Sequence, residues 1–205
     1  MQSSRLSIGT TWSGEETLQF TTLDGGTTQT HRFRVSHRIV GKSGELWTAE
    51  ISTRLIETII DDTHIPPLKA EEPAVSKEFL SPKGFLMYTE PFDNAAFGIE
   101  RLLHFWMPAE SNKSWNVSLG TTDERIVTTA SAQFSSKPPV KSGVSSFFMK
   151  FEETNSFTST GMMSFDPGSG RLMLADLNVR NAFMPGGVVR ANLKLSYRDT
   201  TLAGK

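Results

Sequence analysis

The chain has 205 residues, a formal net charge of −1 and no cysteine. A chain of this length can build one sizeable core that buries about 70% of its unfolded surface. A pI of about 6.4 argues against a nucleic-acid partner, because such proteins usually show a basic patch or a pI above about 9. The missing cysteine excludes disulfides and cysteine-based metal sites, and no apolar run approaches the roughly 20 residues of a membrane span.

The N-terminal part of the chain begins with a polar stretch and a first strand. Residues 1–14 are rich in serine, threonine and glycine, and we expect them to be loosely ordered. A strand from 15 to 22 follows, with Leu18 and Phe20 on one face. Residues 24–26 read Asp-Gly-Gly, which is typical of a hairpin turn because these residues tolerate positive φ.

The segment from His31 to Ile39 has the clearest two-faced strand pattern. Apolar residues and histidines occupy the odd positions, and arginines occupy most of the even positions. A period of two places the first set inward and the arginines outward. After a turn at 41–44, a long partner strand from 47 to 59 repeats this pattern and places Glu50 opposite the arginine row.

The region that follows interrupts the long strands. Residues 61–72 contain two prolines and a pair of glutamates, and we interpret them as a connection. Residues 75–90 are interpreted as a short hairpin, because the sequence at 81–84 reads Ser-Pro-Lys-Gly, with proline and glycine placed as a tight turn requires.

The segment at about 93–107 carries the one convincing helix signal. Apolar residues recur at i, i+3, i+4 and i+7, one face of a helix with 3.6 residues per turn. Asp93 or Asn94 can cap the first turn, and Pro108 ends the segment. The four residues of the apolar face are Ile99, Leu102, Leu103 and Trp106.

Six further strands complete the chain, separated by proline, glycine and asparagine residues. We expect them at about 114–119, 124–135, 143–153, 156–166, 171–183 and 187–199. The total is about eleven antiparallel strands, more than an open sheet carries comfortably before it curls or splits. The sequence therefore predicts a mainly β single domain over 1–205, a strongly curved sheet or half-open barrel with the apolar helix on its concave face. A closed barrel or a two-sheet sandwich is the alternative.

Polar residues give no strong sign of catalysis or metal binding. His31 and His37 lie on one face of the same strand but about 20 Å apart, too far to share a metal ion. Asp61, Asp62 and His64 make the best local metal-like cluster, yet no second group of ligands follows at metal spacing. We therefore predict no catalytic residue, no metal site and no cofactor.

Bulky, adaptable apolar side chains are abundant, with 14 phenylalanines and 8 methionines. Such groups line pockets for apolar ligands, and they also simply fill the groove of a curved sheet. Both interpretations stay open at this point. The candidate groove-lining residues are Phe97, Leu103, Trp106, Met107, Phe147, Met149, Phe151, Met163 and Phe165.

Four blocks in the C-terminal half carry a family resemblance. They are the apolar block from Leu102 to Pro108, the pair Ser114-Trp115, the run from Gly161 to Leu172 and the Pro-Gly-Gly turn at 185–187. In these blocks the chain resembles uncharacterised bacterial cell-envelope proteins, often lipoproteins. Its overall layout is similar to the lipoprotein-carrier fold, an unclosed barrel of about eleven strands with helices against its hollow. The resemblance implies export to the periplasm or cell envelope.

These observations lead to one leading hypothesis and two alternatives. We expect a non-enzymatic cell-envelope protein whose apolar groove binds a lipid-like ligand or a hydrophobic protein partner, with no nucleic acid and no membrane span. The first alternative is a structural or interaction scaffold with a fully packed core. The second is an enzyme, which would need a converging polar cluster that the sequence does not show. No apolar leader follows Met1, so a cytoplasmic protein is an option beside an exported one whose leader has been removed.

Overall fold

The computed structural model describes residues 6–67, 73–80, 86–90, 101–103, 105–107, 114–123, 126–153, 157–183 and 190–201. Within these ranges the chain forms twelve strands and one short 3-10 turn. The elements are β1 (Thr11–Thr22), β2 (Thr28–Ser43), β3 (Leu46–Ile60), β4 (Thr63–Ile65), β5 (Ala74–Leu80), β6 (Leu86–Glu90), η1 (Arg101–Leu103), β7 (Ser114–Asp123), β8 (Ile126–Lys137), β9 (Ser145–Glu153), β10 (Thr158–Phe165), β11 (Leu172–Phe183) and β12 (Arg190–Asp199).

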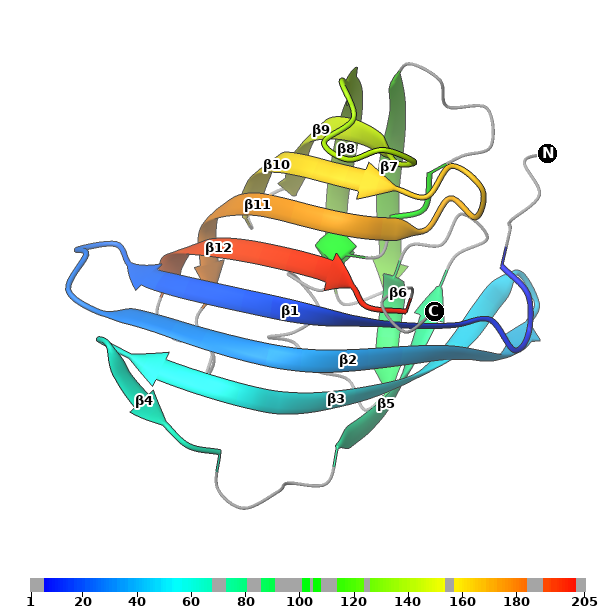
Figure 1. The fold of residues 1–205 in the computed structure, drawn as a ribbon. Coiled ribbons are helices and arrows are strands. Elements are labelled where there is room, and N and C mark those ends of the chain that lie inside the picture. Colours follow the sequence, from blue (N-terminus) through cyan, green and yellow to red (C-terminus); the bar gives the residue numbers. More distant parts are fainter. Residues whose placement is uncertain are drawn as a thin grey trace.

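The strands form one antiparallel sheet that is not closed. Eleven of them follow one another in the order β6-β5-β3-β2-β1-β12-β11-β10-β9-β8-β7, and β4 pairs with β3 beside this path (Figure 1). The sheet curls, so that β7 and β8 lie behind β9 to β12 in the view of Figure 1. The prediction of a mainly β chain with about eleven antiparallel strands in one open sheet is confirmed.

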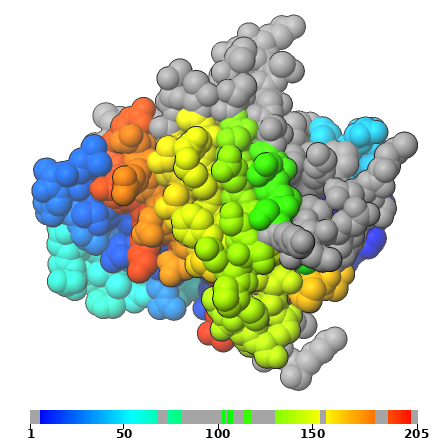
Figure 2. Space-filling model, turned by 90° about the horizontal axis from the view of Figure 1, so that it is seen from above, coloured from blue at the N-terminus to red at the C-terminus, as the bar shows by residue number. Residues whose placement is uncertain are grey.

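The pairing of β1 with β12 joins the two halves of the chain. Leu18 lies opposite Leu195 and Phe20 opposite Leu193, so the first strand completes the sheet next to the last. The space-filling view shows the same neighbours in sequence colours, with blue beside red and orange, then yellow, then green (Figure 2). A contact between the chain ends therefore organises the sheet, although every other neighbouring pair along the path lies close in sequence.

The alternation predicted for β2 is present. Val35, His37 and Ile39 are buried, while the arginines between and before them are exposed. β1 begins at Thr11, earlier than the strand start expected at residue 15, and the buried Trp12 lies near its beginning. β4 lies within the stretch that was interpreted as a connection.

The predicted helix at 93–107 is wrong for the described part of that segment. Arg101–Leu103 form only the turn η1, and residues 105–107 have no regular structure. Residues 91–100, 104 and 108–110, including the proposed cap, Ile99 and Pro108, lie outside the described residues. The apolar spacing predicted a helix whose apolar side chains all lie on one stripe. In the structure, neighbouring side chains of this segment instead pack into two different apolar clusters.

The described residues of this segment (101–103 and 105–107, here called the plug) pack against the sheet. Leu102 and Phe105 are 0% and 1% exposed and belong to the main core, which lies on the inner side of β1, β2 and β7 to β12. Trp106 is only partly buried and packs against a second cluster formed by Leu6, Trp12, Ile39, Ala49 and Leu80. The plug therefore connects two apolar clusters within the hollow of one sheet.

A glycine on β10 lies directly against the backbone of β11. Gly161 lies opposite Leu177, and an added Cβ at Gly161 would come within 2.1 Å of the Asp176 carbonyl oxygen. No side chain fits there without separating the two strands, so this glycine permits tight pairing in the middle of the sheet. Among the described residues, no helix has the length and apolar character needed to cross a membrane.

Candidate functional site

A small cleft opens where the plug meets the sheet. Its walls come from β1, β2, β12, the start of β11 and the plug itself. The enclosed space is about 10 Å3, roughly the room that one water molecule needs. The lining residues, here called the plug cleft, are Trp12, Glu16, His37, Leu103, Phe105, Trp106, Arg171, Leu172 and Tyr197.

Aromatic rings form one wall of the plug cleft. Trp12 and His37 lie opposite each other on β1 and β2, and their rings stack at 4.6 Å with an interplanar angle of 4°. Trp106 of the plug meets Trp12 edge-on at 5.7 Å and 86°. Such edge-to-face pairs contribute about 0.5–1.5 kcal/mol beyond the area they bury. The wall is thus built partly from the sheet and partly from the plug.

Tyr197 forms the floor beside this wall. It lies opposite Glu16 in the pairing of β12 with β1, and its ring covers Gly14, where a Cβ would come within 2.2 Å of the ring. Burial raises the pKa of the Tyr197 hydroxyl well above its usual range, and the negative charges of Asp199 and Glu16 raise it further, while Arg171 lowers it. The hydroxyl therefore stays protonated and uncharged.

The ionisation of Tyr197 can be measured directly, because the chain has two tyrosines. In a Tyr88→Phe variant, we expect tyrosinate absorption to appear only above about pH 10 in the folded protein and at about pH 10 in denaturant. Because the folded pKa is raised, the corresponding stability is complete below about pH 10 and is lost as the pH rises further. A folded-state midpoint at the denatured value would contradict the burial of this hydroxyl.

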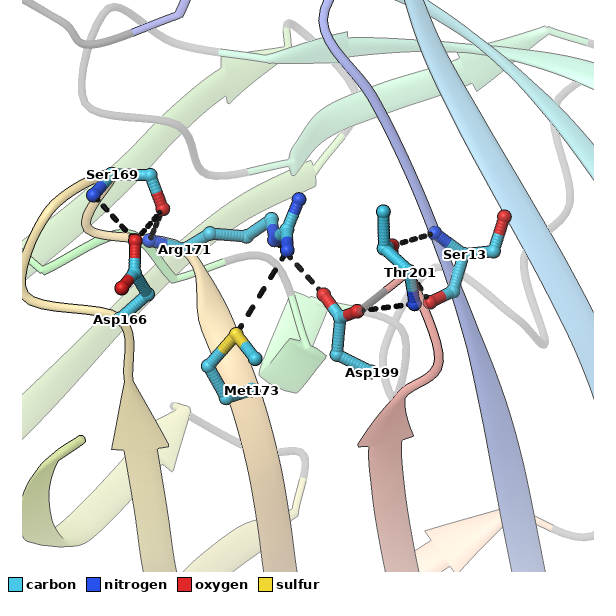
Figure 3. Close-up of polar contacts among 7 residues, drawn as sticks. All are labelled: Ser13, Asp166, Ser169, Arg171, Met173, Asp199 and Thr201. Atoms are coloured by element: carbon cyan, nitrogen blue, oxygen red, sulfur yellow. Dashed lines mark hydrogen bonds and ion pairs between the residues drawn. The ribbon is translucent and has the colours of Figure 1, made fainter. Parts of the chain in front are cut away.

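A buried ion pair lies next to Tyr197. Arg171 Nε and Asp199 Oδ2 are 2.9 Å apart, and their side chains are 13% and 0% exposed (Figure 3). The two atoms do not meet hydrogen-bond geometry, so the contact is an ion pair at close range and not a directed hydrogen bond. The other carboxylate oxygen, Oδ1, accepts a hydrogen bond from the Thr201 backbone N–H at 2.7 Å. Asp199 thus connects the end of β12 to the start of β11.

Ser13 and Thr201 extend this network to β1. The Ser13 N–H donates to Thr201 Oγ1 at 2.8 Å (Figure 3). The Thr200 N–H donates to the Ser13 carbonyl oxygen at 2.8 Å. These bonds hold the chain beyond β12 against the beginning of the first strand. The polar side of the plug cleft is therefore anchored to three strands.

The turn between β10 and β11 holds both the plug and Arg171. Ser169 donates two hydrogen bonds to Asp166 Oδ2, from its backbone N–H at 2.7 Å and its hydroxyl at 2.6 Å (Figure 3). The Met107 N–H of the plug donates to the Gly170 carbonyl oxygen at 2.7 Å. Since Arg171 is the next residue, one turn positions the plug and the ion pair together.

The structure separates the predicted groove residues into three groups. Leu103 and Trp106 line the plug cleft. Phe97 lies outside the described residues. The others are buried in the main core, at 0–7% exposure, and do not line this cleft; they are Met107, Phe147, Met149, Phe151, Met163 and Phe165.

Sequence reasoning missed the polar residues of the plug cleft. Glu16 falls between Gly14 and Leu18 on the inward face of β1, and a charged residue on an apolar face was the signal that could have identified it. Asp199 likewise continues the inward positions of β12 after Leu195 and Tyr197. Arg171 had no such signal, because it stands in a turn and only the folded chain brings it to Asp199.

The plug cleft combines aromatic surface with the charged side chains of Glu16 and Arg171. Within the described ranges, no three histidine, aspartate or glutamate side chains gather in a way that could hold a metal ion. No protein-family model matches the chain, and the search of curated proteins found no match.

Proposed function

We propose that this chain is a non-enzymatic binding protein that holds a lipid-like or otherwise apolar ligand in the hollow of its sheet. The observation that carries the proposal is the plug. A segment with little regular structure places Leu102, Phe105 and Met107 in the hollow, in contact with apolar residues of the inner sheet face. Those contacts are made by side chains, which an apolar ligand can replace.

The proposed ligand takes the place of the plug in the hollow. With the plug in place, the enclosed space is only about 10 Å3, too small for a lipid chain. Binding therefore requires the plug to leave the hollow, and the ligand's apolar body then replaces the buried area that Leu102 and Phe105 contribute. Glu16, His37 and Arg171 at the plug cleft would contact the polar end of the ligand.

The proposal includes a location in the bacterial cell envelope. Its support is the resemblance, seen in the sequence, between the layout of this chain and that of lipoprotein carriers. A fold by itself does not decide a function, so the proposal depends on ligand binding being measured.

The closely filled interior favours a second candidate, an interaction scaffold whose core is complete without a ligand. In that case the plug is a permanent part of the core. The two candidates differ in whether the plug moves, which a distance measurement can decide.

Because the chain has no cysteine, introduced cysteines give unique spin-label positions. We expect a label pair at Leu103→Cys and Ser36→Cys to change its distance distribution when a fluorescent naphthylamine probe or oleate is added. The matched pair Ser36→Cys and Asn192→Cys, both on exposed sheet positions, should not change.

Saturable binding of the probe and a distance change confined to the plug pair would support the carrier. Native mass spectrometry of the purified protein, together with analysis of its lipid extract, supplies a third readout, the co-purified ligand itself. Absence of saturable binding together with an unmoved plug would reject the carrier and leave the scaffold.

A further inference from the structure

The outer face of the sheet differs strongly in charge from the chain as a whole. On β11, β12, β1, β2 and β3, the described outward positions carry eight cationic side chains against four carboxylates, a formal excess of four positive charges where the entire chain has −1. The cations are Arg32, Arg34, Arg38, Arg54, Arg180, Arg190, Lys194 and Arg198, and the carboxylates are Glu15, Glu50, Glu57 and Asp176.

The pairing registers place part of this charge in one row across four neighbouring strands. Arg54 lies opposite Arg34, Arg34 lies opposite Glu15, and Glu15 lies opposite Arg198. We call these four residues the arginine row. With strands about 4.8 Å apart, the row covers about 15 Å and holds three guanidinium groups with one carboxylate.

The arginine row keeps positive charge that its own carboxylate does not balance. Glu15 pairs with Arg34 at 3.3 Å. Arg34 also faces Arg54 directly, and like charges at such positions destabilise a sheet. All three arginines are exposed, so an external anion can reach them and relieve this repulsion.

We propose that the arginine row and the cationic face around it dock this protein on an anionic lipid bilayer. A bilayer presents many anionic head groups in one plane, and each nearby arginine or lysine strengthens the binding about fivefold. The shape and composition of the face favour this partner over nucleic acid. The described outward positions of β1, β2, β3 and β12 hold no aromatic residue for base stacking, and these strands form part of the broad curved face seen in Figure 1.

This inference rests on the outer face and is independent of the ligand site proposed for the hollow. A protein that binds no apolar ligand could still dock in this way, and the reverse also holds. The two proposals therefore fail separately.

The test compares two triple variants of the full chain that remove the same charge. Arg34→Gln, Arg54→Gln and Arg198→Gln together neutralise the row. Lys137→Gln, Lys141→Gln and Lys150→Gln remove three exposed cations from the region of β8 and β9. Binding is measured by cosedimentation with phosphatidylcholine vesicles that contain or lack phosphatidylglycerol, at low and high salt.

We expect the wild-type protein to bind only the vesicles with phosphatidylglycerol, and the binding to weaken with salt because added ions screen exposed charges. The row variant should bind about a hundredfold more weakly, and the lysine variant should stay within about threefold of wild type. The row variant should melt no lower than wild type, because the repulsion between Arg34 and Arg54 is gone.

Three results would overturn the proposal. The first is no wild-type binding to phosphatidylglycerol vesicles. The second is an equal loss of binding in both triple variants, which would make the effect one of total charge. The third is tight binding of a labelled oligonucleotide by the wild-type protein together with no binding of the phosphatidylglycerol vesicles.

Discussion

Replacing Phe105 with alanine should lower the free energy of unfolding by about 3–5 kcal/mol. Phe105 is 1% exposed in the plug, and its ring meets Phe134 edge-on at 5.1 Å and Phe151 at 6.5 Å. Truncation removes these contacts and leaves a cavity that the rigid sheet cannot close. Chemical denaturation of both proteins gives the difference.

Phe148 provides the matched control for this change. It is the same residue type on β9, but it is 39% exposed on the outer face of the sheet. Phe148→Ala should therefore cost less than about 1 kcal/mol. If Phe105→Ala lowers the free energy of unfolding by as little as Phe148→Ala, the plug does not contribute to the core. Within the plug, truncating the partly buried Trp106 to alanine should lower the free energy of unfolding by less than truncating Phe105 does.

Replacing Asp199 with asparagine should cost about 3–5 kcal/mol of unfolding free energy. The change keeps the shape of the side chain but leaves the Arg171 guanidinium in a largely buried place without its counter-charge. The exposed pair of Lys150 and Glu152, 2.6 Å apart, is the control. Glu152→Gln should change the stability by less than about 1 kcal/mol, since water screens an exposed pair.

A double-mutant cycle distinguishes the ion pair from a general effect of the mutation. We expect Arg171→Met combined with Asp199→Asn to cost much less than the two single changes added together, because the double variant buries no uncompensated charge. Additive losses would show that Arg171 and Asp199 act independently. Equilibrium denaturation of the four proteins at neutral pH supplies all the values.

The strand pattern was predictable because burial on a sheet alternates with a period of two. In β2, burial alternates between the buried Val35, His37 and Ile39 and the exposed Arg34, Ser36 and Arg38. This alternation is a local signal that needs no knowledge of the rest of the fold. The helix prediction relied on a local signal as well, but four apolar residues at helical spacing are a weak one. The segment instead sends Leu102 and Phe105 into one cluster and Trp106 toward another.

Two of the residues proposed to line a groove, Leu103 and Trp106, line the plug cleft. They were proposed as residues of an apolar helix on the concave face, because bulky apolar side chains can line a pocket there. The five candidates on β9 and β10 are buried core residues, since apolar content alone does not distinguish a pocket wall from a packed interior. Arg171 was missed because its partner Asp199 lies far away in sequence. Glu16 could have been identified from its place on the inward face of β1.

By itself, the sequence determined that this chain is mainly β, with antiparallel strands that each bury one side. That property follows from residues two positions apart, so a short stretch of sequence is enough to reveal it. Only the tertiary structure decided that β1 joins β12, that the plug fills the hollow without a helix, and that Arg171 meets Asp199 beside Tyr197. Those features depend on contacts such as that between Ser13 and Thr201, 188 residues apart, which no local pattern encodes.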